Sequence, residues 1–317
     1  MWNGSKPRYN SSKDYPLALD IRDIAISKLS GSGNDFLCID SRHGQFNALL
    51  AAPAGISHFA RTLCRRERGV GADGLIFAVR PEIDGVADLG ARFFEPDGSE
   101  AELCGNGTAC FTRWAIDAGW RRDDVRILTT AGVVIGKPSD GLYYRVCIPL
   151  PENIHRHMTV TVNGQRWDCD EATVGVPHLI VYVEDLPHLD ITRWGPLLRH
   201  HPQFQPRGIN ANFVRLLGEG ELALRTWEFG VEGETLACGT GSAAAAVLAS
   251  LRAEWGESFT RGKKPVLVHA RSGDILRIYF NRRADGHIDE LCLETQVRYL
   301  FTGHLHPDAV ATALAAT

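Results

Sequence analysis

The sequence predicts an α+β protein with two similar domains related by pseudo-twofold symmetry. A Cys-Gly-x-Gly turn occurs twice, opening at Cys104 and at Cys238. Each turn leads into a run of small and apolar residues that is typical of a buried helix. Short β-branched and aromatic runs, bounded by Gly, Pro, Asp or Asn, surround both turns as expected of strands. The 317 residues suffice for two ordinary domains.

In the first half of the chain, residues 1–23 are largely polar and interrupted by proline, so we expect an extension outside the domains. A helix is expected near 55–66 and another at about 108–118, where Gly119 ends it because glycine adopts the left-handed conformation of helix ends. Strands are expected at 24–28, 36–40, 74–79, 89–94, 125–130 and 142–148.

The second half repeats this order of elements after a proline-rich break at 149–151. Strands are expected at 159–162, 179–183, 211–216, 222–227, 266–268 and 275–281, and helices near 191–200 and 242–251. We therefore expect an N-terminal domain at 24–151 that carries Cys104, a C-terminal domain at 152–296 that carries Cys238, and a segment at 297–317 that returns to the first domain.

Charge and hydropathy exclude several classes of partner. The net charge is −4, the pI is near 6.3, and Lys and Arg are dispersed, so no basic surface for nucleic acid or acidic membranes is expected. No apolar run is long enough to cross a bilayer, and no charged-then-apolar leader is present. We expect a cytoplasmic protein whose partner is a small molecule, and a homodimer stays an open alternative.

The eight cysteines do not follow the spacing of a metal site. No Cys-x-x-Cys pair and no Cys and His cluster at zinc spacing occurs, so no metal is expected. Without an export signal, free thiols are expected in place of a disulfide framework. Cys38, Cys147 and Cys292 are interpreted as small packing residues because they lie in apolar runs, and Cys110 is interpreted in the same way because it lies inside the predicted helix.

Cys104 and Cys238 are expected to be reactive. Glycines let a backbone approach a ligand closely, and a helix N-terminus presents unpaired N–H groups and a partial positive charge. Both effects lower the pKa of a thiol. Because both thiols lie in the same kind of turn at a helix N-terminus, we expect one to act as a base and the other as an acid. If the two domains face each other about the pseudo-twofold axis, the two thiols meet across the cleft between them.

Six ordered phrases resemble the diaminopimelate epimerase family. They are SGNDF at 32–36, RGVGADG at 68–74, DGSEAELCGNG at 97–107, GVPH at 175–178, NANF at 210–213 and GETLACGTG at 233–241. Their order and spacing cover roughly residues 24–303. The resemblance implies two domains, each a mixed, mostly antiparallel sheet curled around a central helix. It also implies inversion at an amino-acid α-carbon without pyridoxal phosphate, metal or any other cofactor.

The resemblance implies a role for each residue of the site. One catalytic thiol, Cys104 or Cys238, removes the α-proton while the other supplies a proton on the opposite face, and the roles exchange with reaction direction. Backbone N–H groups of the two turns bind the α-carboxylate. The expected substrate-binding residues are Asn34, Gly105, Asn106, Asn210, Glu228, Gly239 and Thr240.

Three positions depart from the family pattern. Glu95 and Val176 each stand where the family usually has Asn, and Phe229 stands where it has Arg. Those family positions contact the distal carboxylate of diaminopimelate, so this site is expected to suit a cationic or aromatic side chain better. Arg225 is a candidate replacement for the missing guanidinium. His178 is interpreted either as a further specificity residue or as a structural histidine.

The default function is epimerisation of LL- and meso-diaminopimelate, a step of lysine and peptidoglycan precursor biosynthesis. The alternative within the class is a racemase of another amino acid, such as lysine, arginine or histidine. A non-catalytic amino-acid-binding protein on the same fold is the alternative from another class. The presence of both thiols argues against that last alternative.

Overall fold

The computed structural model describes residues 23–81, 85–121 and 123–315. The expected N-terminal extension at 1–23 therefore lies outside the described residues, except for Asp23. The chain forms two compact units, which we call unit 1 and unit 2.

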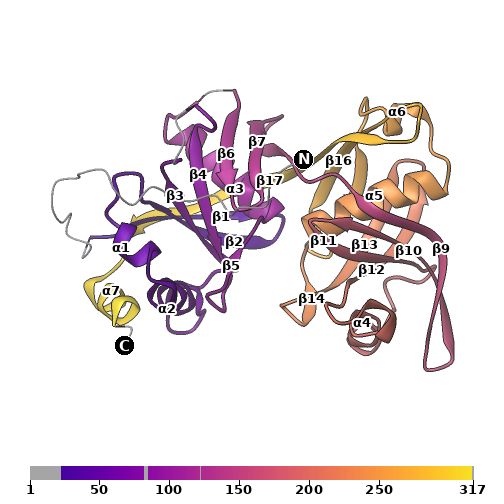
Figure 1. Cartoon of the computed structure of the whole chain (residues 1–317), viewed down its shortest axis with the longest axis horizontal. Coiled ribbons are helices and arrows are strands. Elements are labelled where there is room, and N and C mark those ends of the chain that lie inside the picture. The colour runs from indigo at the N-terminus through magenta and orange to yellow at the C-terminus, as the bar shows by residue number, and fades with distance from the viewer. Residues whose placement is uncertain (1–22, 82–84, 122, 316–317) are drawn as a thin grey trace. The chain divides into compact units, whose positions relative to one another are not determined.

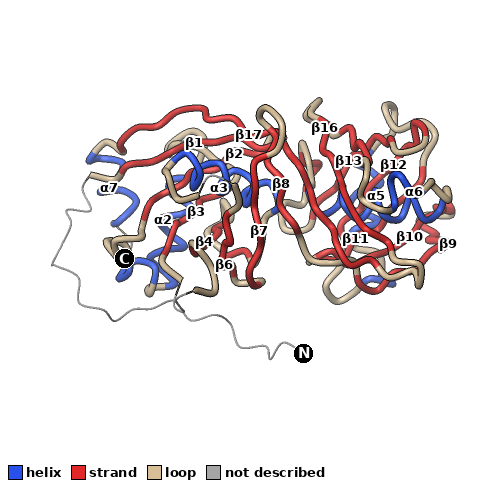
Figure 2. The backbone as a smooth tube through the Cα atoms, turned by 90° about the horizontal axis from the view of Figure 1, so that it is seen from above, coloured by secondary structure: helices blue, strands red, loops and turns tan. Residues whose placement is uncertain are grey.

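Unit 1 combines the chain up to Tyr144 with the chain from Val297 onward, and unit 2 runs from Arg145 to Gln296. Two strands, β8 (Tyr143–Cys147) and β17 (Ile288–His304), therefore belong to both units. The division lies within β8, a few residues before the proline-rich break at 149–151. In unit 1, β17 pairs antiparallel with β1 (Ala25–Gly31), and Figure 2 shows the two strands side by side.

Unit 1 is a mixed sheet around the helix α3 (Gly105–Asp117) (Figure 1). Besides β1, its strands are β2 (Asn34–Asp40), β3 (Gly74–Val79), β4 (Leu89–Phe94), β5 (Glu100–Ala101), β6 (Val125–Thr129) and β7 (Gly132–Pro138). The pairs β2–β3 and β4–β6 are parallel, whereas β1–β2, β3–β4, β4–β5 and β6–β7 are antiparallel. Helix α3 contacts β1, β2, β3, β6 and β7.

Helix α3 is a core helix because its residues are small or apolar on nearly every side. Ten of its 13 residues are buried, including the stacked rings of Phe111 and Trp114, whose centroids lie 5.4 Å apart. The strand β7 approaches the helix closely at Gly136, where a Cβ atom would lie 1.9 Å from Oγ1 of Thr112. Only glycine fits there without a shift of strand or helix.

Substituting Gly136→Ala is therefore expected to lower the free energy of unfolding by about 1–3 kcal/mol, as overpacked cores do. Urea unfolding followed by circular dichroism measures the change. Gly303→Ala is the matched control, since Gly303 also lies in a strand of unit 1 but a Cβ there meets no atom within 4 Å. Equal stability of the two variants would contradict the packing of β7 on α3.

A second core in unit 1 lies between the sheet and the helices α1 (Asn47–Leu50), α2 (Pro53–Cys64) and α7 (Pro307–Leu314). The Phe77 ring on β3 lies 5.5 Å from Phe46 and 6.0 Å from Phe59, centroid to centroid. The C-terminal residues Val310 and Ala313 of α7 belong to the same buried cluster. The end of the chain thus packs on the N-terminal part of unit 1.

Unit 2 repeats the architecture around α5 (Gly239–Arg252). Its other elements are β9 (Glu152–Val162), β10 (Gln165–Val174), β11 (Val176–Tyr182), β12 (Asn210–Gly218), β13 (Glu221–Glu228), β14 (Gly233–Thr235), β15 (Val266–His269), β16 (Ile275–Arg282), α4 (Ile191–Arg199), α6 (Glu257–Thr260) and a 3₁₀ turn at Pro202–Phe204. The pairs β11–β12 and β13–β15 are parallel and the others antiparallel.

The helix α5 has 11 of its 14 residues buried, including four consecutive alanines that begin at Ala243. It contacts β10, β11, β12, β13, β15 and β16. Small side chains let this many strands approach one helix. The predicted α+β class, with a mixed and mostly antiparallel sheet around a central helix in each unit, is confirmed.

Several elements differ from the expected ranges. Both central helices begin earlier than expected, because the Cys-Gly-x-Gly segment is itself the first helical turn. Strands β7 and β10 and helix α7 were not predicted. Their sequences carry weak signals: β7 contains two glycines, and β10 contains acidic residues that disfavour strands. Pairing with neighbouring strands of the sheet stabilises β7 and β10 in spite of these residues.

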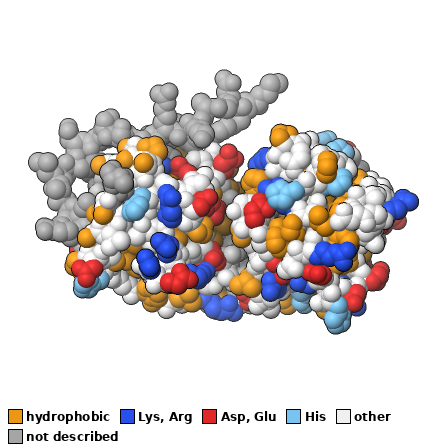
Figure 3. Space-filling model, turned by 90° about the horizontal axis from the view of Figure 1, so that it is seen from below, with side chains coloured by type: hydrophobic (Ala, Val, Ile, Leu, Met, Phe, Trp, Pro, Cys, Tyr) orange, Lys and Arg blue, Asp and Glu red, His pale blue; other side chains and the backbone are white. Residues whose placement is uncertain are grey.

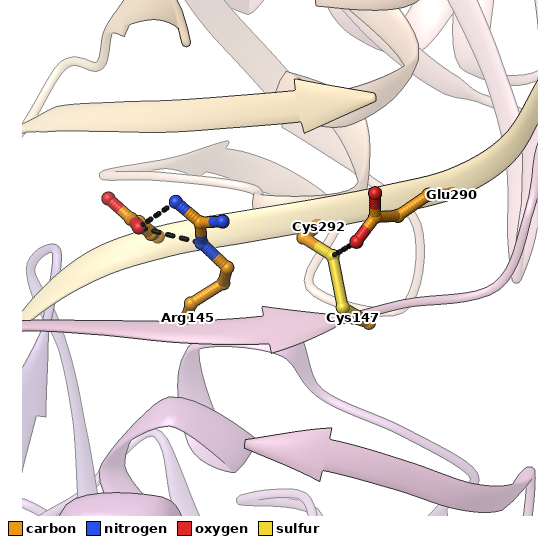
Figure 4. The surroundings of a disulfide bond; sticks show 5 residues. Arg145, Cys147, Glu290 and Cys292 are labelled. Atoms are coloured by element: carbon orange, nitrogen blue, oxygen red, sulfur yellow. Dashed lines mark hydrogen bonds and ion pairs between the residues drawn. A yellow bond between two sulfur atoms is a disulfide. The ribbon is translucent and has the colours of Figure 1, made fainter. Parts of the chain in front are cut away.

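The expectation of free thiols is wrong for Cys147 and Cys292, which form a disulfide (Figure 4). Strand β8 pairs with β17, and the N–H of Ile148 donates to the carbonyl oxygen of Leu291 at 3.0 Å. This register places the two cysteines opposite each other, with Cα atoms 4.0 Å apart. Cys38 and Cys110 are buried free thiols, as expected.

The Cys292→Ala variant is expected to lose about 2–4 kcal/mol of unfolding free energy, because the crosslink joins positions 145 residues apart and restricts the unfolded chain. Urea unfolding without reductant measures the loss. Cys38→Ala is the control: it also truncates a fully buried cysteine, but it breaks no crosslink. Mass mapping that finds Cys147 and Cys292 both alkylated in unreduced, unfolded wild-type protein would contradict the disulfide.

Candidate active site

Cys104 is the N-cap residue of α3, with an extended backbone (φ −129°, ψ 116°). Its half-buried sulfur accepts a hydrogen bond from the N–H of Gly107 at 3.4 Å. Its carbonyl oxygen accepts both the N–H and the hydroxyl of Thr108, each at 2.7 Å. These contacts fix the sulfur at the positive end of the helix, next to the first backbone N–H groups at Gly105 and Asn106.

Asn34 and Asn106 contact each other beside Cys104. The amide nitrogen of Asn106 donates to Oδ1 of Asn34 at 2.9 Å, and the Asn34 amide nitrogen donates to Asp73 at 3.3 Å. Within the described part of the chain, Oδ1 of Asn106 is buried and has no hydrogen-bond partner. A buried acceptor without a partner is costly unless a ligand donates to it.

A carboxylate network that was not predicted supports these asparagines. Asp35 forms ion pairs with Lys28 at 2.8 Å and with Arg66 at 2.9 Å, and Arg66 also pairs with Asp73 at 2.6 Å. Burial opposes ionisation of Asp35, but hydrogen bonds from Lys28 and Arg66 hold its pKa below the usual value. The phrases SGNDF and RGVGADG contain or adjoin most of these residues, and only their pairing was missing.

Glu95 is half-buried in the tight turn between β4 and β5. Its N–H donates to the carbonyl oxygen of Ser99 at 2.8 Å, and its carbonyl oxygen accepts the N–H of Gly98 at 2.9 Å. The turn needs glycine at position 98, where φ is +85° and a Cβ would lie 2.2 Å from the backbone of Ser57. Glu95 therefore sits on a rigid turn, a short way along the chain before Cys104.

Cys238 is the N-cap residue of α5, with nearly the same backbone angles (φ −119°, ψ 111°). Its carbonyl oxygen accepts the N–H and the hydroxyl of Ser242 at 2.9 and 2.7 Å. Its buried sulfur lies 3.7 Å from the hydroxyl of Thr240. A Cβ at Gly241 would lie 2.4 Å from Oδ1 of Asn212 and 3.2 Å from this sulfur, so glycine is needed beside the thiol.

His178 is fully buried and lies next to this turn. Its Nε2 is 3.1 Å from the hydroxyl of Thr240, and its Nδ1 is 3.2 Å from the amide nitrogen of Asn212. Burial lowers the pKa of His178 to about 3, so the ring is neutral at physiological pH. The ring thus contacts a predicted substrate-binding residue, and the interpretation of His178 as a specificity residue stays a prediction.

The contacts of residues 228–232 could not be expected from the replacement of the family arginine by Phe229 alone. The N–H of Phe229 donates to Oδ1 of Asn210 at 2.7 Å, and the carbonyl oxygen of Glu228 accepts the N–H of Glu232 at 2.9 Å. The guanidinium of Arg199 lies 4.3 Å from the centre of the Phe229 ring and pairs with Glu232 at 3.0 Å. Sequence reasoning missed Arg199, because no motif contains it.

Arg225 does not replace the missing guanidinium, so that interpretation is wrong. Arg225 donates two hydrogen bonds to Glu234, at 2.7 and 3.0 Å, and two more to the carbonyl oxygens of Leu186 and Leu189. All of these partners belong to unit 2, so the Arg225 side chain stabilises the fold of that unit. Val176 is half-buried at the start of β11, where it pairs with Val174.

The predicted site residues therefore form two clusters. In unit 1, Asn34 and Asn106 contact each other, and Gly105 and Asn106 directly follow Cys104. In unit 2, Cys238 and His178 both contact Thr240. The disulfide is a separate pair of cysteines. Its sulfurs carry no proton to transfer, so it does not supply the two thiols of the predicted site.

Charges of both signs are mixed on the face of the protein that Figure 3 draws. On this face, Lys and Arg side chains lie among Asp and Glu side chains. Among the helices of residues 23–81, 85–121 and 123–315, none has the length and apolar character needed to cross a membrane.

Solved structures with the same fold include an epimerase and a phenazine biosynthesis protein. A hydroxyproline epimerase of Agrobacterium vitis, with bound trans-4-hydroxy-L-proline, has a TM-score of 0.64 at 17% identity, covering 91% of this chain and 94% of that one. A Bacillus anthracis phenazine biosynthesis protein of the PhzF family has a TM-score of 0.65 at 15% identity, covering 89% and 99%. At these identities the likeness concerns the fold.

Sequence comparison identifies the family. The family model described as "Diaminopimelate epimerase" matches residues 26–141 and 172–285, which include both cysteine turns. The diaminopimelate epimerase of Aquifex aeolicus is 38% identical over 289 residues, covering 89% of this chain and 98% of that protein. The diaminopimelate epimerase of Moorella thermoacetica is 35% identical, covering 78% and 88%. With the two helix-capping cysteines and these matches over most of its length, the chain belongs to the diaminopimelate epimerase family.

Proposed function

We propose that this protein inverts the α-carbon of an amino acid by acid/base catalysis with two thiols, Cys104 and Cys238, and without pyridoxal phosphate. The observation that carries the proposal is that both cysteines cap the N-terminus of a buried central helix with nearly equal backbone angles. A helix N-terminus stabilises a thiolate. Family membership and relatives named diaminopimelate epimerase support the same chemistry.

Stereoinversion needs a base on one face of the α-carbon and an acid on the other. In the proposed mechanism, the thiolate of one cysteine takes the α-proton and the thiol of the other delivers a proton to the opposite face. The negative charge that develops on the carboxylate is stabilised by backbone N–H groups of the two turns, which include those of Gly105 and Gly239. The unpartnered Oδ1 of Asn106 suits a hydrogen bond from the substrate ammonium group.

The other cysteines do not suit these roles. Burial raises the pKa of Cys64 and Cys169 to about 12 and places those of Cys38 and Cys110 far above the usual range. The Cys147 and Cys292 sulfurs are joined in the disulfide. Exclusion of these six residues supports the assignment of proton transfer to the two capping cysteines.

Diaminopimelate is the proposed substrate, because the relatives that match most of this chain carry that name. A racemase of a cationic or aromatic amino acid is the second candidate. The observation that favours it is that Phe229 replaces the family arginine while Arg225 is bound to Glu234. The low net charge supports a small-molecule partner, and a cytoplasmic address is part of the same proposal.

A stereochemical assay over a panel of amino acids tests the proposal. The panel holds LL- and meso-diaminopimelate and the L-isomers of lysine, arginine, histidine and phenylalanine, with products separated by chiral chromatography. Inversion of diaminopimelate alone supports the default, and inversion of a cationic or aromatic amino acid supports the second candidate. If folded protein binds an amino acid from the panel but inverts none, the binding-protein alternative holds instead.

A further inference from the structure

Three side chains with metal-binding atoms lie together on the strand pair β8–β17. They are Cys147 on β8 and Cys292 and Glu290 on β17 (Figure 4). The two sulfurs and one carboxylate oxygen of Glu290 all lie within 4.8 Å of one another. Cys292 and Glu290 share a face of β17 because side chains two positions apart in a strand point the same way. The register of the strands brings Cys147 to them from 145 positions away, so spacing along the chain could not predict the cluster.

The carboxylate of Glu290 is available to an added cation. Glu290 is exposed and forms no ion pair within the part of the chain that the structure describes. Its Oε1 lies 3.6 Å from the sulfur of Cys292. The other carboxylate two positions beyond Cys292, that of Glu294, is fully buried and accepts a hydrogen bond from Nε of Arg145 at 2.7 Å. The guanidinium of Arg145 also lies 3.8 Å from the centre of the Tyr279 ring, so this cation is already paired.

Reduction of the disulfide gives the cluster the distances of a zinc site. In tetrahedral coordination, Zn–S bonds of about 2.3 Å and Zn–O bonds of about 2.1 Å place sulfur and oxygen about 3.6 Å apart and two sulfurs about 3.8 Å apart. The carboxylate oxygen of Glu290 lies at that distance, 3.6 Å, from the sulfur of Cys292. The Cβ atoms of directly opposed strand residues are about 4.5–5.5 Å apart, so rotation about the Cα–Cβ bonds can bring the freed sulfurs to the required separation.

We propose that the reduced side chains of Cys147 and Cys292, together with Glu290, bind one divalent cation that prefers sulfur ligands, such as Zn²⁺. A dithiol reductant supplies two electrons and two protons to the disulfide and is itself oxidised to a disulfide. The cation then displaces the two thiol protons, which pass to the solvent, and forms two bonds to sulfur and one to the carboxylate. Water completes the tetrahedron, since Glu290 is exposed and Cys147 is half-buried. Mg²⁺ and Ca²⁺ do not suit this site because they prefer oxygen ligands throughout.

The same two cysteines thus join β8 to β17 in two ways. The disulfide joins the strands in the oxidised protein, and the cation joins them in the reduced protein. Thiols are kept reduced in the cytoplasm, the address proposed above, so the metal-bound form is the one expected there. The binding itself depends neither on that address nor on the proposed function, because Cys104 and Cys238 take no part in the site.

Titration of the full-length protein with Co²⁺ tests the inference, because Co²⁺ bound tetrahedrally by thiolates absorbs intensely whereas free Co²⁺ does not. All proteins carry Cys104→Ala and Cys238→Ala, so that those two thiols bind no cobalt. The protein is reduced with a dithiol, the reductant is removed in the absence of air, and CoCl₂ is added. We expect one Co²⁺ per chain, which Zn²⁺ displaces and Mg²⁺ does not, and no absorption from the oxidised protein.

Two variants and a matched control identify the ligands. Cys292→Ser should abolish the cobalt absorption because it removes a thiolate. Glu290→Gln should weaken cobalt binding at least about tenfold, since even the loss of an indirect partner of a metal site has an effect of that size. Asp289→Asn is the control: it removes the adjacent carboxylate, which pairs with Arg283 at 2.6 Å, and should leave the affinity unchanged.

Three results would overturn the inference. They are the absence of cobalt absorption in the reduced protein, absorption that persists in Cys292→Ser, and equal affinities of Glu290→Gln and its parent protein. If Cys292→Ser does not fold, the comparison of Glu290→Gln with Asp289→Asn still decides, because both variants keep the two cysteines. Failure of the proposed function leaves these results unchanged, since the proteins tested lack the two capping thiols.

Discussion

Replacing either Cys104 or Cys238 by alanine is expected to lower the rate of stereoinversion by about a thousandfold or more, because each change removes proton transfer on one face of the α-carbon. The loss should appear in kcat, since the thiols act on the reacting atoms. Chiral chromatography of the product, with the substrate that the panel identifies, measures the rate. Substantial inversion by either variant would contradict the two-thiol mechanism.

Cys110→Ala is the matched control for these variants. Cys110 lies on the same helix as Cys104 and is fully buried, so its truncation tests the effect of a small cavity near the site. We expect a modest loss of stability and nearly full activity. Circular dichroism and thermal unfolding of all three variants separate loss of chemistry from loss of fold. An inactive but folded Cys110→Ala protein would show that thiols other than the capping pair matter.

The double variant Glu95→Asn, Phe229→Arg is expected to raise the preference for diaminopimelate over lysine at least about tenfold, measured as the ratio of kcat/KM values. The first change removes a negative charge that repels a distal carboxylate, and the second supplies a guanidinium that binds one. A wild-type ratio that already favours diaminopimelate strongly would show that Glu95 and Phe229 do not set the specificity.

The single variants are informative because Phe229 is not isolated. Arg199 lies against its ring and pairs with Glu232, so Phe229→Arg places a second guanidinium beside the first. We expect Phe229→Arg alone to be less stable than wild type and the two sites to act non-additively. Phe229→Leu is the control, as it removes the aromatic ring without adding a charge. If Leu and Arg at position 229 change the specificity ratio equally, charge is not the cause.

Local patterns were sufficient to predict the central helices and the capping cysteines. Each turn sits directly before a helix of small residues, and both signals lie within about twenty consecutive positions around Cys104 and Cys238. The parallel and antiparallel strand pairs confirm the predicted fold class. The weaker strands, such as β10 with its acidic residues, could not be predicted because their partners in the sheet stabilise them.

Features that depend on strand register were not accessible from the sequence. Cys147 and Cys292 each resemble a packing residue, and only the pairing of β8 with β17 makes them neighbours. The contacts of His178 likewise depend on Asn212 and Thr240, which lie 34 and 62 positions away. The interpretation of Arg225 failed for the same reason, because its partners Leu186 and Leu189 come from a distant loop.

The most direct test of the two-thiol account is early-time labelling in deuterium oxide. One pure stereoisomer of the substrate is incubated with the wild-type protein, and both isomers are separated and weighed by mass spectrometry before a tenth of the substrate has reacted. If two thiols act on opposite faces, the product isomer contains one solvent deuterium at the α-carbon while the remaining substrate still contains hydrogen. Product that retains the original hydrogen, or remaining substrate labelled as fast as the product, would show that a single base serves both faces and would contradict the account.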